Sequence, residues 1–294
     1  MNDLDLSGLK IVIVNWCQPI DTIECIHSLI NYGVPSESIL VIDNGSTDNS
    51  VDLINKAYPD IEIHKMAQNL GFTGGYNYGI ETALKAGASK IFLLNNDTIV
   101  DQNTIPHLLT SNWDVSVPKI YFYDNPKLIW AAGARWRRFP PMVIMRGYQH
   151  PDNSQYDNPV PLEYATACAL MIRREVIEQI GGFDDIFKNY QEDYDFCYRV
   201  RKAGFSIGYV PNAKVWHKVS KSLGALSPKK WWYLGRNYVL FYRNNERFPE
   251  RSLAIFLAWV TVREMFKLNF NQLLEFWRGV QVGREWIKHG TSRM

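Results

Sequence analysis

The feature that most constrains how this sequence can fold is a short apolar run that ends abruptly in polar side chains. The clearest example is Lys90–Asp97, where four large apolar residues are followed by two amides and a carboxylate. A run of this kind predicts a strand that is buried on both faces. Asp97 would then lie at the carboxyl end of the strand, the edge where open α/β sheets bind ligands. Taken alone, the same residue fits equally well as a cap for the turn that follows at Thr98.

The pattern recurs along the N-terminal part of the chain, with helical segments between the apolar runs. Predicted strands cover Leu9–Val14, Ser38–Ile42 and Ile61–Ile63, before the run that ends at Leu94. The order β-α-β-α-β-α-β favours an α/β fold with a mostly parallel sheet, flanked by helices and joined by right-handed connections. Polar residues follow each of these strands, so we expect a ligand site at the sheet edge.

A nicotinamide-dinucleotide fold is the main rival for this order of strands and helices. That fold expects the glycine pattern GxGxxG directly after the first strand. Here the same place holds Asn15-Trp-Cys-Gln-Pro19, and the glycines further along have other spacings. The sequence therefore disfavours a dinucleotide oxidoreductase.

Acidic side chains mark the start of two predicted helices. The segment Asp21-Thr-Ile-Glu24 predicts a capping box, in which the Asp21 side chain accepts a hydrogen bond from the amide of Glu24. Glu192, Asp193 and Asp195 crowd the first turn of a later helix, where the helix dipole favours carboxylates. That placement explains all three without catalysis, so a catalytic role needs other support.

The pattern weakens over Asp101–Leu162, a stretch rich in Pro, Asn and Asp that predicts loops and short strands. The basic and aromatic run Arg135–Phe139 within it fits a solvated face as well as it fits an acceptor-binding surface. Regular structure returns with predicted strands at Ala167–Ile172 and Ser206–Val210, and the second of these leads to His217.

Composition and cysteine usage are those of a globular intracellular enzyme. Hydrophobic residues make up 46% and charged residues 21% of the 294 residues, enough for a full core. The four cysteines form no CxxC pair and no secretory signal precedes them, so we expect reduced thiols in a cytoplasmic protein. The net charge of +2 indicates no nucleic-acid partner.

Residues 228–294 differ in charge from the rest of the chain, and we expect them to form a separate helical extension. They hold 12 Lys and Arg against 5 Asp and Glu, whereas residues 1–227 hold 20 against 25. The apolar run Leu253–Val262 is about half as long as the roughly 20 residues needed to cross a bilayer. Two interpretations remain open: helices packed on the preceding domain, or a surface in the membrane interface. The second would place five tryptophans at the lipid headgroups, namely Trp231, Trp232, Trp259, Trp277 and Trp286.

Six motifs occur in an order that resembles a known family. They are Asp43–Asp48, Asn69–Gly75, Leu94–Asp97, Gly181–Asp184, Glu192-Asp193 and Trp216-His217. The set resembles family-2 glycosyltransferases of the GT-A fold, a Rossmann-like α/β fold, and in particular their rhamnosyltransferase-like members. The similarity covers roughly residues 9 to 224. It implies a GT-A catalytic domain over residues 1–227, with nucleotide-sugar binding in the first half and the acceptor side and base in the second.

The resemblance implies a nucleotide-sugar donor and places five residues around it. Asn15 and Asp43, at the ends of the first two strands, would cradle the nucleoside, with Asp43 accepting the pyrimidine N3–H. Asn69 and Gly75 would lie in the loop beside the base and the ribose. Asn96 would contact the donor from a DXD-type motif.

The same motif implies a divalent metal, Mg²⁺ or Mn²⁺. This chain has asparagine at positions 95 and 96, so Asp97 alone offers a carboxylate from the motif. The resemblance adds His217 as a second ligand, with phosphate oxygens and water completing the set. A hard cation that bridges the phosphates stabilises the charge of the leaving group. The missing carboxylates leave the dependence on metal open.

Transfer with inversion needs a base on the acceptor side to take the proton of the attacking hydroxyl. The resemblance assigns this role to Asp193, with Glu192 as its neighbour or as an acceptor contact, and leaves Asp195 as a helix cap. A nucleotide-sugar or glycan-binding module without catalysis is the alternative, because Asn-Asn-Asp is poor in carboxylates. A pure binding protein, however, has no need of a base.

The resemblance thus implies an inverting, metal-dependent hexosyltransferase of bacterial cell-surface polysaccharide synthesis, with the donor suggested by the resemblance alone. The expected donor is dTDP-rhamnose, and a UDP-hexose is the first alternative because no residue distinguishes these sugars. The expected acceptor is a hydroxyl of a glycan or of a lipid-linked oligosaccharide. We expect a cytoplasmic protein with peripheral contact to the inner face of the plasma membrane, and the sequence leaves a homo-oligomer open.

Overall fold

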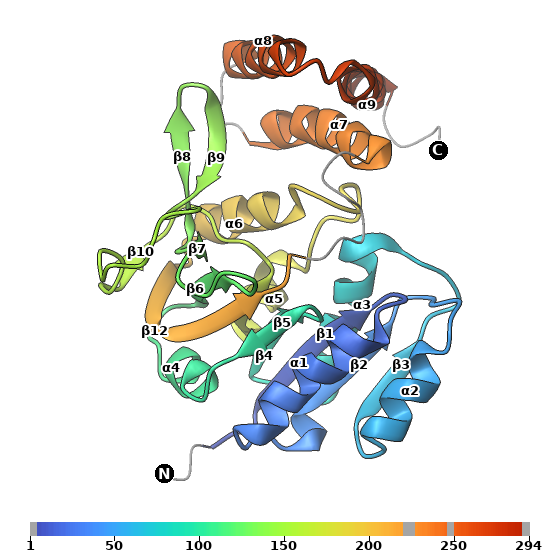
Figure 1. Cartoon of the computed structure of the whole chain (residues 1–294), viewed down its shortest axis with the longest axis vertical. Helices are drawn as coiled ribbons and strands as arrows, with labels where there is room; N and C mark the ends of the chain where they lie inside the picture. Colours follow the sequence, from blue (N-terminus) through green and yellow to red (C-terminus); the bar gives the residue numbers. More distant parts are fainter. Residues whose placement is uncertain (1–4, 220–226, 246–249, 290–294) are drawn as a thin grey trace.

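The computed structural model describes residues 5–219, 227–245 and 250–289, and its centre is a curled, mixed β-sheet (Figure 1). In spatial order the strands are β10 (Val160–Pro161), β12 (Ile207–His217), β6 (Val115–Phe122), β11 (Ala169–Arg173), β4 (Lys90–Asn95), β1 (Leu9–Asn15), β2 (Ile39–Asp43) and β3 (Glu62–Lys65). Three further pairings complete the strands: β5 (Thr98–Val100) with β12, β7 (Ile129–Ala131) with β6, and β8 (Ala134–Arg138) with β9 (Pro141–Met145) as a separate hairpin.

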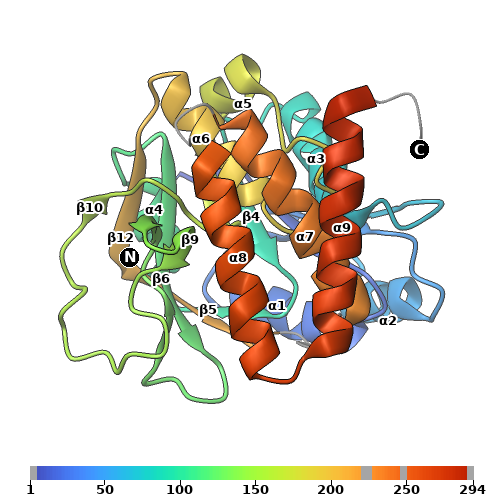
Figure 2. The ribbon, with the colours of Figure 1, turned by 90° about the horizontal axis from the view of Figure 1, so that it is seen from above.

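Helices lie on the faces of this sheet and across one end of the molecule (Figures 1 and 2). They are α1 (Pro19–Asn31), α2 (Ser50–Ala57), α3 (Gly71–Lys85), α4 (Thr104–Leu109), α5 (Arg174–Ile180), α6 (Glu192–Lys202), α7 (Pro228–Asn244), α8 (Glu250–Phe266) and α9 (Phe270–His289), with a short 3-10 turn η1 (Ser36–Ser38) before β2. The predicted fold class, an α/β fold with a C-terminal helical extension, is confirmed.

The predicted parallel half of the sheet is also confirmed. Strands β3, β2, β1 and β4 run parallel to one another, with α1, α2 and α3 in the connections. Val12 and Ile13 are fully buried in two different hydrophobic clusters, as expected for a strand covered on both faces. Asn15 lies opposite Asp43 in register, and Val14 lies opposite Asn95. The polar ends of three strands therefore meet at one edge.

The glycine-rich stretch after β3 forms helix α3 rather than a loop, which corrects the predicted position of Gly75. A Cβ atom at Gly75 would lie 2.9 Å from Cγ1 of Val14, and one at Gly79 would lie 2.3 Å from Cγ1 of Val12. These glycines therefore let α3 pack closely against β1. Gly75 lies inside a helix, against the sheet, because only a residue without a side chain fits there.

The second half of the sheet contains a long central strand, β6, that the sequence pattern does not predict. Pro118 and Lys119 interrupt its apolar run, although the strand is buried along most of its length. Lys119 is buried because its ammonium group pairs with Asp152 at 2.9 Å and with Asp157 at 2.6 Å. A buried lysine with two carboxylate partners looks like a loop residue in the sequence alone.

The predicted capping box at Asp21 is wrong, because α1 begins earlier, at Pro19. Gln18 is the N-cap residue and makes no side-chain capping bond. Asp21 instead accepts a hydrogen bond from Nζ of Lys218 at 2.6 Å, and Glu24 pairs with the same ammonium group. The residue after β12 is thereby held against the first turns of α1.

The C-terminal helices form a layer in which α8 and α9 run side by side in opposite directions, over α7 (Figure 2). Glycines bring α7 and α9 into backbone contact. A Cβ atom at Gly235 would lie 1.9 Å from the carbonyl oxygen of Phe276, and one at Gly279 would lie 2.0 Å from that of Trp232. Among the described helices, none combines the length and the apolar character needed to span a bilayer.

Helix α7 shares its core with the rest of the molecule. Phe241 is fully buried in the same hydrophobic cluster as Phe187 and Phe196, which precede and follow the start of α6. The ring centroid of Phe241 is 6.2 Å from that of Tyr164. The end of the sequence resemblance, at residue 224, and the segment that leads into α7 lie outside the described residues.

Candidate active site

A buried hydrogen-bond network joins the ends of β1 and β2. The side-chain amide of Asn15 donates to Oδ1 of Asp43 at 2.8 Å and to Oγ of Ser46 at 3.2 Å. The backbone N–H of Ser46 donates to the other carboxylate oxygen of Asp43 at 3.1 Å. Asn15 and Asp43 are both fully buried. The Asp43 side chain therefore holds the loop after β2 against the end of β1.

Asn96 belongs to the same network through Thr22 of α1. The amide of Asn96 donates to Oγ1 of Thr22 at 3.1 Å, and this hydroxyl donates to Oδ1 of Asn15 at 2.8 Å. Asn96 is 8% exposed, so little of it faces solvent. The structure thus brings together three of the residues that are predicted to contact the nucleotide-sugar donor, namely Asn15, Asp43 and Asn96. Thr22 lies in the segment predicted as a capping box and Ser46 in the motif Asp43–Asp48, but the sequence assigns neither hydroxyl a role at the site, because a buried hydroxyl carries no distinguishing pattern.

Asn69 lies in a loop that is tied to the loop after β2. Asn44 accepts a hydrogen bond from the backbone N–H of Leu70 at 3.0 Å and donates to the carbonyl oxygen of Gly71 at 2.9 Å. Oδ1 of Asn69 accepts from the N–H of Gly71 at 2.8 Å, and the residue is exposed. The predicted placement of Asn69 beside the donor stays a prediction, and the structure supplies Asn44 as the residue that fixes its loop.

Asp97 and His217, 120 positions apart in the chain, are neighbours in the structure. Nε2 of His217 lies 3.3 Å from Oδ2 of Asp97, and both side chains are buried. The pairing of β5 with β12 aligns His217 with Thr98 and so brings the two together. The Trp130 ring covers the imidazole edge-on, with 4.6 Å between the ring centroids. Burial lowers the pKa of His217, but Cys168 and Asp97 outweigh this and raise the pKa to about 10.

This pair fits a divalent cation that is shared with a ligand. Nδ1 of His217 is buried and makes no hydrogen bond to any described residue, and the Asp97 carboxylate lies beside the same ring. Carboxylate oxygen and the nitrogen of a neutral imidazole suit Mn²⁺, and carboxylate oxygen suits Mg²⁺, so a bound cation would have to displace the proton that the raised pKa keeps on His217. The described residues contain no cluster of three or more His, Cys, Asp or Glu that could hold a metal alone. Other ligands, such as phosphate oxygens, would therefore have to complete the coordination.

Glu192 and Asp193 open α6 after a backbone segment with unusual conformation. Lys188, Tyr190 and Gln191 all have positive φ angles, of 57°, 68° and 67°. Non-glycine residues in this region are costly and cluster at functional sites. The surrounding structure must therefore hold this segment in place.

The two carboxyl groups differ in environment although they are adjacent. Burial and the charge of Asp193 raise the pKa of Glu192 well above its usual value, and its Oε2 has no hydrogen-bond partner among the described residues. Burial also raises the pKa of Asp193, to about 6, while hydrogen bonds from Ala167 and Tyr194 limit the shift. Of the two groups Asp193 therefore gives up its proton more readily, and Glu192 keeps its proton to higher pH.

The segment that enters β11 joins the carboxylate pair to the Asp97–His217 pair. The N–H of Ala167 donates to Oδ2 of Asp193 at 3.4 Å. The carbonyl oxygen of the next residue, Cys168, accepts from the N–H of Asn95 at 2.9 Å, and the Cys168 side chain lies next to His217. The structure thus brings both predicted groups to one edge of the sheet. The sequence predicts a strand here but gives no signal for this linking role.

The C-terminal extension supports the same edge. Nδ2 of Asn237, in α7, lies 2.8 Å from the carbonyl oxygen of Phe187, 2.6 Å from that of Asn189 and 2.8 Å from that of Tyr190. Asn237 is fully buried. From the other side, Oδ1 of Asn189 accepts from the N–H of Phe72 at 3.2 Å. The strained segment before Glu192 is therefore fixed between α7 and the start of α3.

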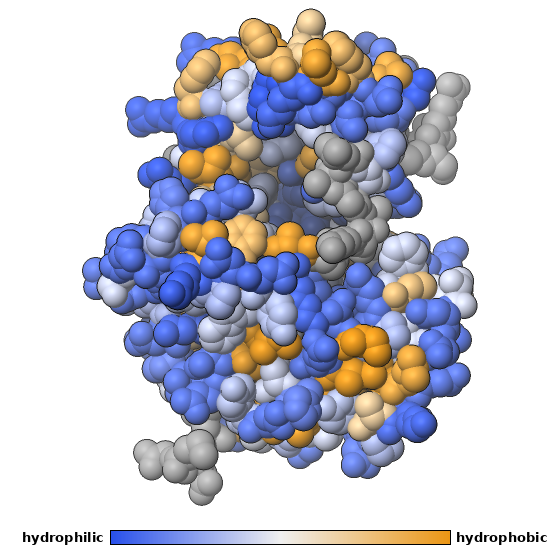
Figure 3. All heavy atoms as spheres, in the orientation of Figure 1, coloured by the Kyte–Doolittle hydropathy of each residue, from blue (hydrophilic) through white to orange (hydrophobic). Residues whose placement is uncertain are grey.

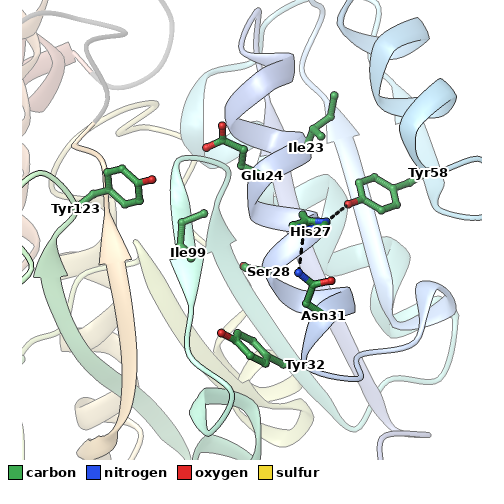
Figure 4. Close-up of a pocket in the computed structure, with 9 residues that line it drawn as sticks. All are labelled: Ile23, Glu24, His27, Ser28, Asn31, Tyr32, Tyr58, Ile99 and Tyr123. Atoms are coloured by element: carbon green, nitrogen blue, oxygen red, sulfur yellow. Dashed lines mark hydrogen bonds between the residues drawn. The ribbon is translucent and has the colours of Figure 1, made fainter.

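The molecule is hollowed between the layer of C-terminal helices and the sheet below it (Figure 3). A separate groove of about 450 Å³ lies on the outer face of α1, where His27 bonds to Tyr58 at 3.0 Å and to Asn31 at 2.9 Å (Figure 4). None of the residues predicted for donor, metal or base lines this groove.

The fold is that of a GT-A glycosyltransferase. The sequence model described as "Glycosyl transferase family 2" matches residues 11–181, more than half of the chain. The protein therefore belongs to glycosyltransferase family 2, which confirms the resemblance stated from its motifs.

Similar sequences carry names of the same kind. The chain is 26% identical over 277 residues to the "Low-salt glycan biosynthesis hexosyltransferase Agl10" of Haloferax volcanii, an alignment of 89% of this chain and 86% of that protein. It is 28% identical over 214 residues to the "N-acetylglucosaminyl-diphospho-decaprenol L-rhamnosyltransferase" of Mycobacterium tuberculosis, covering 64% of this chain and 68% of that protein.

Solved structures share the fold at low sequence identity. GalNAc-T7 with UDP, GalNAc and Mn²⁺ superposes with a TM-score of 0.59 at 17% identity, over 83% of this chain and 52% of that one. The chain thus spans about half the length of that protein. The mannosyltransferase PcManGT of Pyrobaculum calidifontis, with GDP-Man and Mn²⁺, gives a TM-score of 0.54 at 13% identity, over 97% and 76%.

Proposed function

We propose that this protein is an inverting glycosyltransferase that uses a nucleotide sugar and a divalent cation. Our first candidate for the donor is dTDP-rhamnose, and the acceptor is a hydroxyl of a glycan or of a lipid-linked oligosaccharide in cell-surface polysaccharide synthesis. The name of the mycobacterial relative supports both choices, because it specifies a rhamnosyltransferase and a decaprenol-linked sugar.

The observation that best supports catalysis is that two different pairs of side chains, each containing an acidic group, lie at the same edge of the sheet. Asp97 with His217 offers a place for a cation, and Glu192 with Asp193 offers a carboxylate pair that shares one proton. A protein that only binds nucleotide sugars needs the first but not the second. Pairs of titratable groups whose environments push their pKa values apart are typical of acid–base catalysis.

In this proposal each pair acts on a different part of the reaction. Asp193, ionised at neutral pH, accepts the proton of the acceptor hydroxyl as that oxygen attacks the anomeric carbon. Glu192, which keeps its proton, can donate a hydrogen bond to the acceptor. Asp97 and His217 would hold the cation, and the cation would stabilise the negative charge of the departing nucleoside diphosphate.

A UDP-hexose is the second candidate for the donor, because solved structures of the same fold bind UDP with a hexose derivative. Isothermal titration of the protein with Mn²⁺ against dTDP-rhamnose, UDP-glucose, UDP-galactose and GDP-mannose tests the choice, with donor hydrolysis as a second readout. We expect tightest binding and fastest hydrolysis for dTDP-rhamnose. Preference for a UDP-hexose would replace the rhamnose assignment, and binding of every donor without hydrolysis or transfer would favour a non-catalytic module.

We also propose that residues 1–227 supply the catalytic domain and residues 228–294 an extension that approaches the membrane. A lipid-linked acceptor would require the enzyme to work at the inner face of the plasma membrane. Incubation with labelled dTDP-rhamnose and extracted lipid-linked oligosaccharides tests the acceptor, and a labelled lipid product is the expected result.

A further inference from the structure

The turn between α8 and α9 exposes apolar side chains and buries a charged one, the reverse of what water favours. Phe266 is 86% exposed, Leu268 73% and Phe270 58%. Glu264, at the same turn, is 1% exposed, and its carboxylate accepts a hydrogen bond from Nδ2 of Asn269 at 2.7 Å. Charged residues are seldom buried unless they are paired. The buried carboxylate of Glu264 therefore serves to hold the shape of the turn.

The exposed apolar surface continues from this turn along α8. Ile255, Val262 and Met265 are 40%, 54% and 51% exposed. Their spacing, with Ala258 between them, places them on one helical face, while Phe256, Leu257 and Val260 are buried on the other. Hydrophobic residues gather over α8 at the top of the molecule (Figure 3). Apolar surface of this extent marks an interaction site more often than an unused face.

The charges around this surface select the kind of partner. In the described parts of α8, α9 and their turn, five exposed cations accompany one exposed carboxylate, Glu285. The cations are Arg251, Lys267, Arg278, Arg284 and Lys288. A symmetric contact between two copies would place this basic face against itself, which like-charge repulsion opposes. An anionic bilayer supplies both an apolar interior and negative headgroups.

We propose that the α8–α9 turn and the outer face of α8 dock the protein on anionic lipid bilayers, with Phe266, Leu268 and Phe270 entering the interface. The docking surface itself is independent of the proposed function. Only its role rests on that function, namely to bring the hollow between the helices and the sheet to a lipid-linked acceptor. In Figure 2, which shows the molecule from above, the turn lies at the lower edge of the picture. This edge is the side that faces the viewer in Figures 1 and 3, and the hollow opens on the same side.

The surface differs from the one predicted from sequence. Trp231 is buried, and the other four tryptophans of the extension are partly buried, three of them packed against the core. The aromatic residues that reach solvent at the turn are Phe266 and Phe270. The proposed docking surface therefore lies in the segment that the tryptophans point to, but it is formed by other residues.

The test is flotation of the full-length protein with vesicles of phosphatidylcholine alone or with phosphatidylglycerol. We expect the wild type to float with phosphatidylglycerol vesicles at low salt and to be released as salt screens the charges. The double substitution Phe266→Ser and Leu268→Ser should lower partitioning by at least about tenfold, because each side chain contributes apolar transfer free energy. Lys267→Glu should lower binding to anionic vesicles and leave binding to phosphatidylcholine alone unchanged.

Matched controls are Tyr32→Ser, which removes a side chain that is 50% exposed at the far end of α1, and Lys56→Glu on α2. Both should float like the wild type. Failure of the wild type to bind anionic vesicles would overturn the proposal, as would unchanged binding of the double variant. Self-association of the wild type without lipid, lost in the double variant, would assign the surface to a second copy and also overturn it.

Nucleotide-sugar titration of the same proteins separates this inference from the proposed function. Normal donor binding without flotation contradicts the docking surface alone. Flotation without donor binding contradicts the proposed function and leaves the docking surface standing.

Discussion

At the scale of single residues, Glu192 and Asp193 show how two adjacent carboxyl groups acquire different properties. We expect Asp193→Asn to lower transfer by at least about 10²-fold, the range for loss of a general base, with donor affinity near that of the wild type. Glu192→Gln should stay within about threefold, because it replaces a neutral acid by a neutral amide. Labelled transfer to extracted acceptor, together with donor titration, measures both.

The pH dependence of the same reaction gives a second measurement. The pKa of Asp193 is raised to about 6, so the group is protonated and inactive below that pH and becomes a base as pH rises through it. Transfer by the wild type should therefore increase with pH around 6 and then level off. Asp193→Asn should lose this dependence, and unchanged turnover in that variant would remove Asp193 from the mechanism.

The metal prediction also concerns single residues. Asp97→Asn and His217→Gln keep the approximate shape of the side chains, and each should weaken Mn²⁺-dependent donor binding by at least about tenfold. Asp124→Ala, which removes an exposed carboxylate, serves as the control and should bind the donor normally. If EDTA changes neither binding nor transfer in the wild type, the metal site is wrong.

Sequence reasoning locates residues better than it locates their contacts. Asp97 at the end of a buried strand follows from the apolar run, but its approach to His217 depends on the pairing of β5 with β12. The sequence also does not predict that Asp43 is buried against Asn15, because a carboxylate at the end of a strand can equally well face a ligand. Pairings and burial of this kind require tertiary structure.

At the scale of elements, α7 acts on the candidate site through Asn237. Asn237→Ala removes this partner from three carbonyl oxygens, although that of Phe187 still accepts the N–H of Asn189, and we expect a loss of stability of about 1–3 kcal/mol. We expect transfer to fall by about 10- to 10²-fold, because Asp193 loses its position, while donor affinity changes little. The rise of activity with pH should also move toward lower pH, as a loosened segment exposes Asp193 to water.

The control for this prediction is Lys229→Ala, an exposed position on the same helix, which should change none of these quantities. If Asn237→Ala lowers the melting temperature but leaves the pH profile of transfer unchanged, Asn237 contributes to stability and not to the position of Asp193.

Elements differ in how well the sequence predicts them, for identifiable reasons. The first four strands alternate with helices and are predicted nearly to their ends. Apolar runs mark β1, β2 and β4, whereas β3 (Glu62–Lys65) is mostly polar and follows from its place in the alternation. β6 is missed because Pro118 and Lys119 interrupt its apolar pattern, and the carboxylates that pair with Lys119 lie more than thirty positions further along the chain. Gly75 is misplaced because glycines that allow close packing of a helix look like glycines of a loop.

At the scale of the whole molecule, the division into a catalytic part and an extension can be tested by deletion. Removal of residues 228–294 would expose the cluster that Phe241 shares with Phe187 and Phe196. An apolar patch of this kind promotes aggregation, so we expect the shortened chain to be largely insoluble and to bind no donor. A monomeric, donor-binding fragment in gel filtration and titration would instead show that residues 1–227 fold alone.

The backbone contact between α7 and α9 has a mechanical consequence. With Gly235 and Gly279 pressed against carbonyl oxygens of the partner helix, the two helices cannot slide past each other and must move as one body. Any tilt imposed on α9 at a bilayer would pass to α7, and from Asn237 to the strained segment before Glu192. If the enzyme docks on a bilayer as proposed, this linkage would make its turnover number depend on docking, and rates measured in lipid-free buffer would understate it.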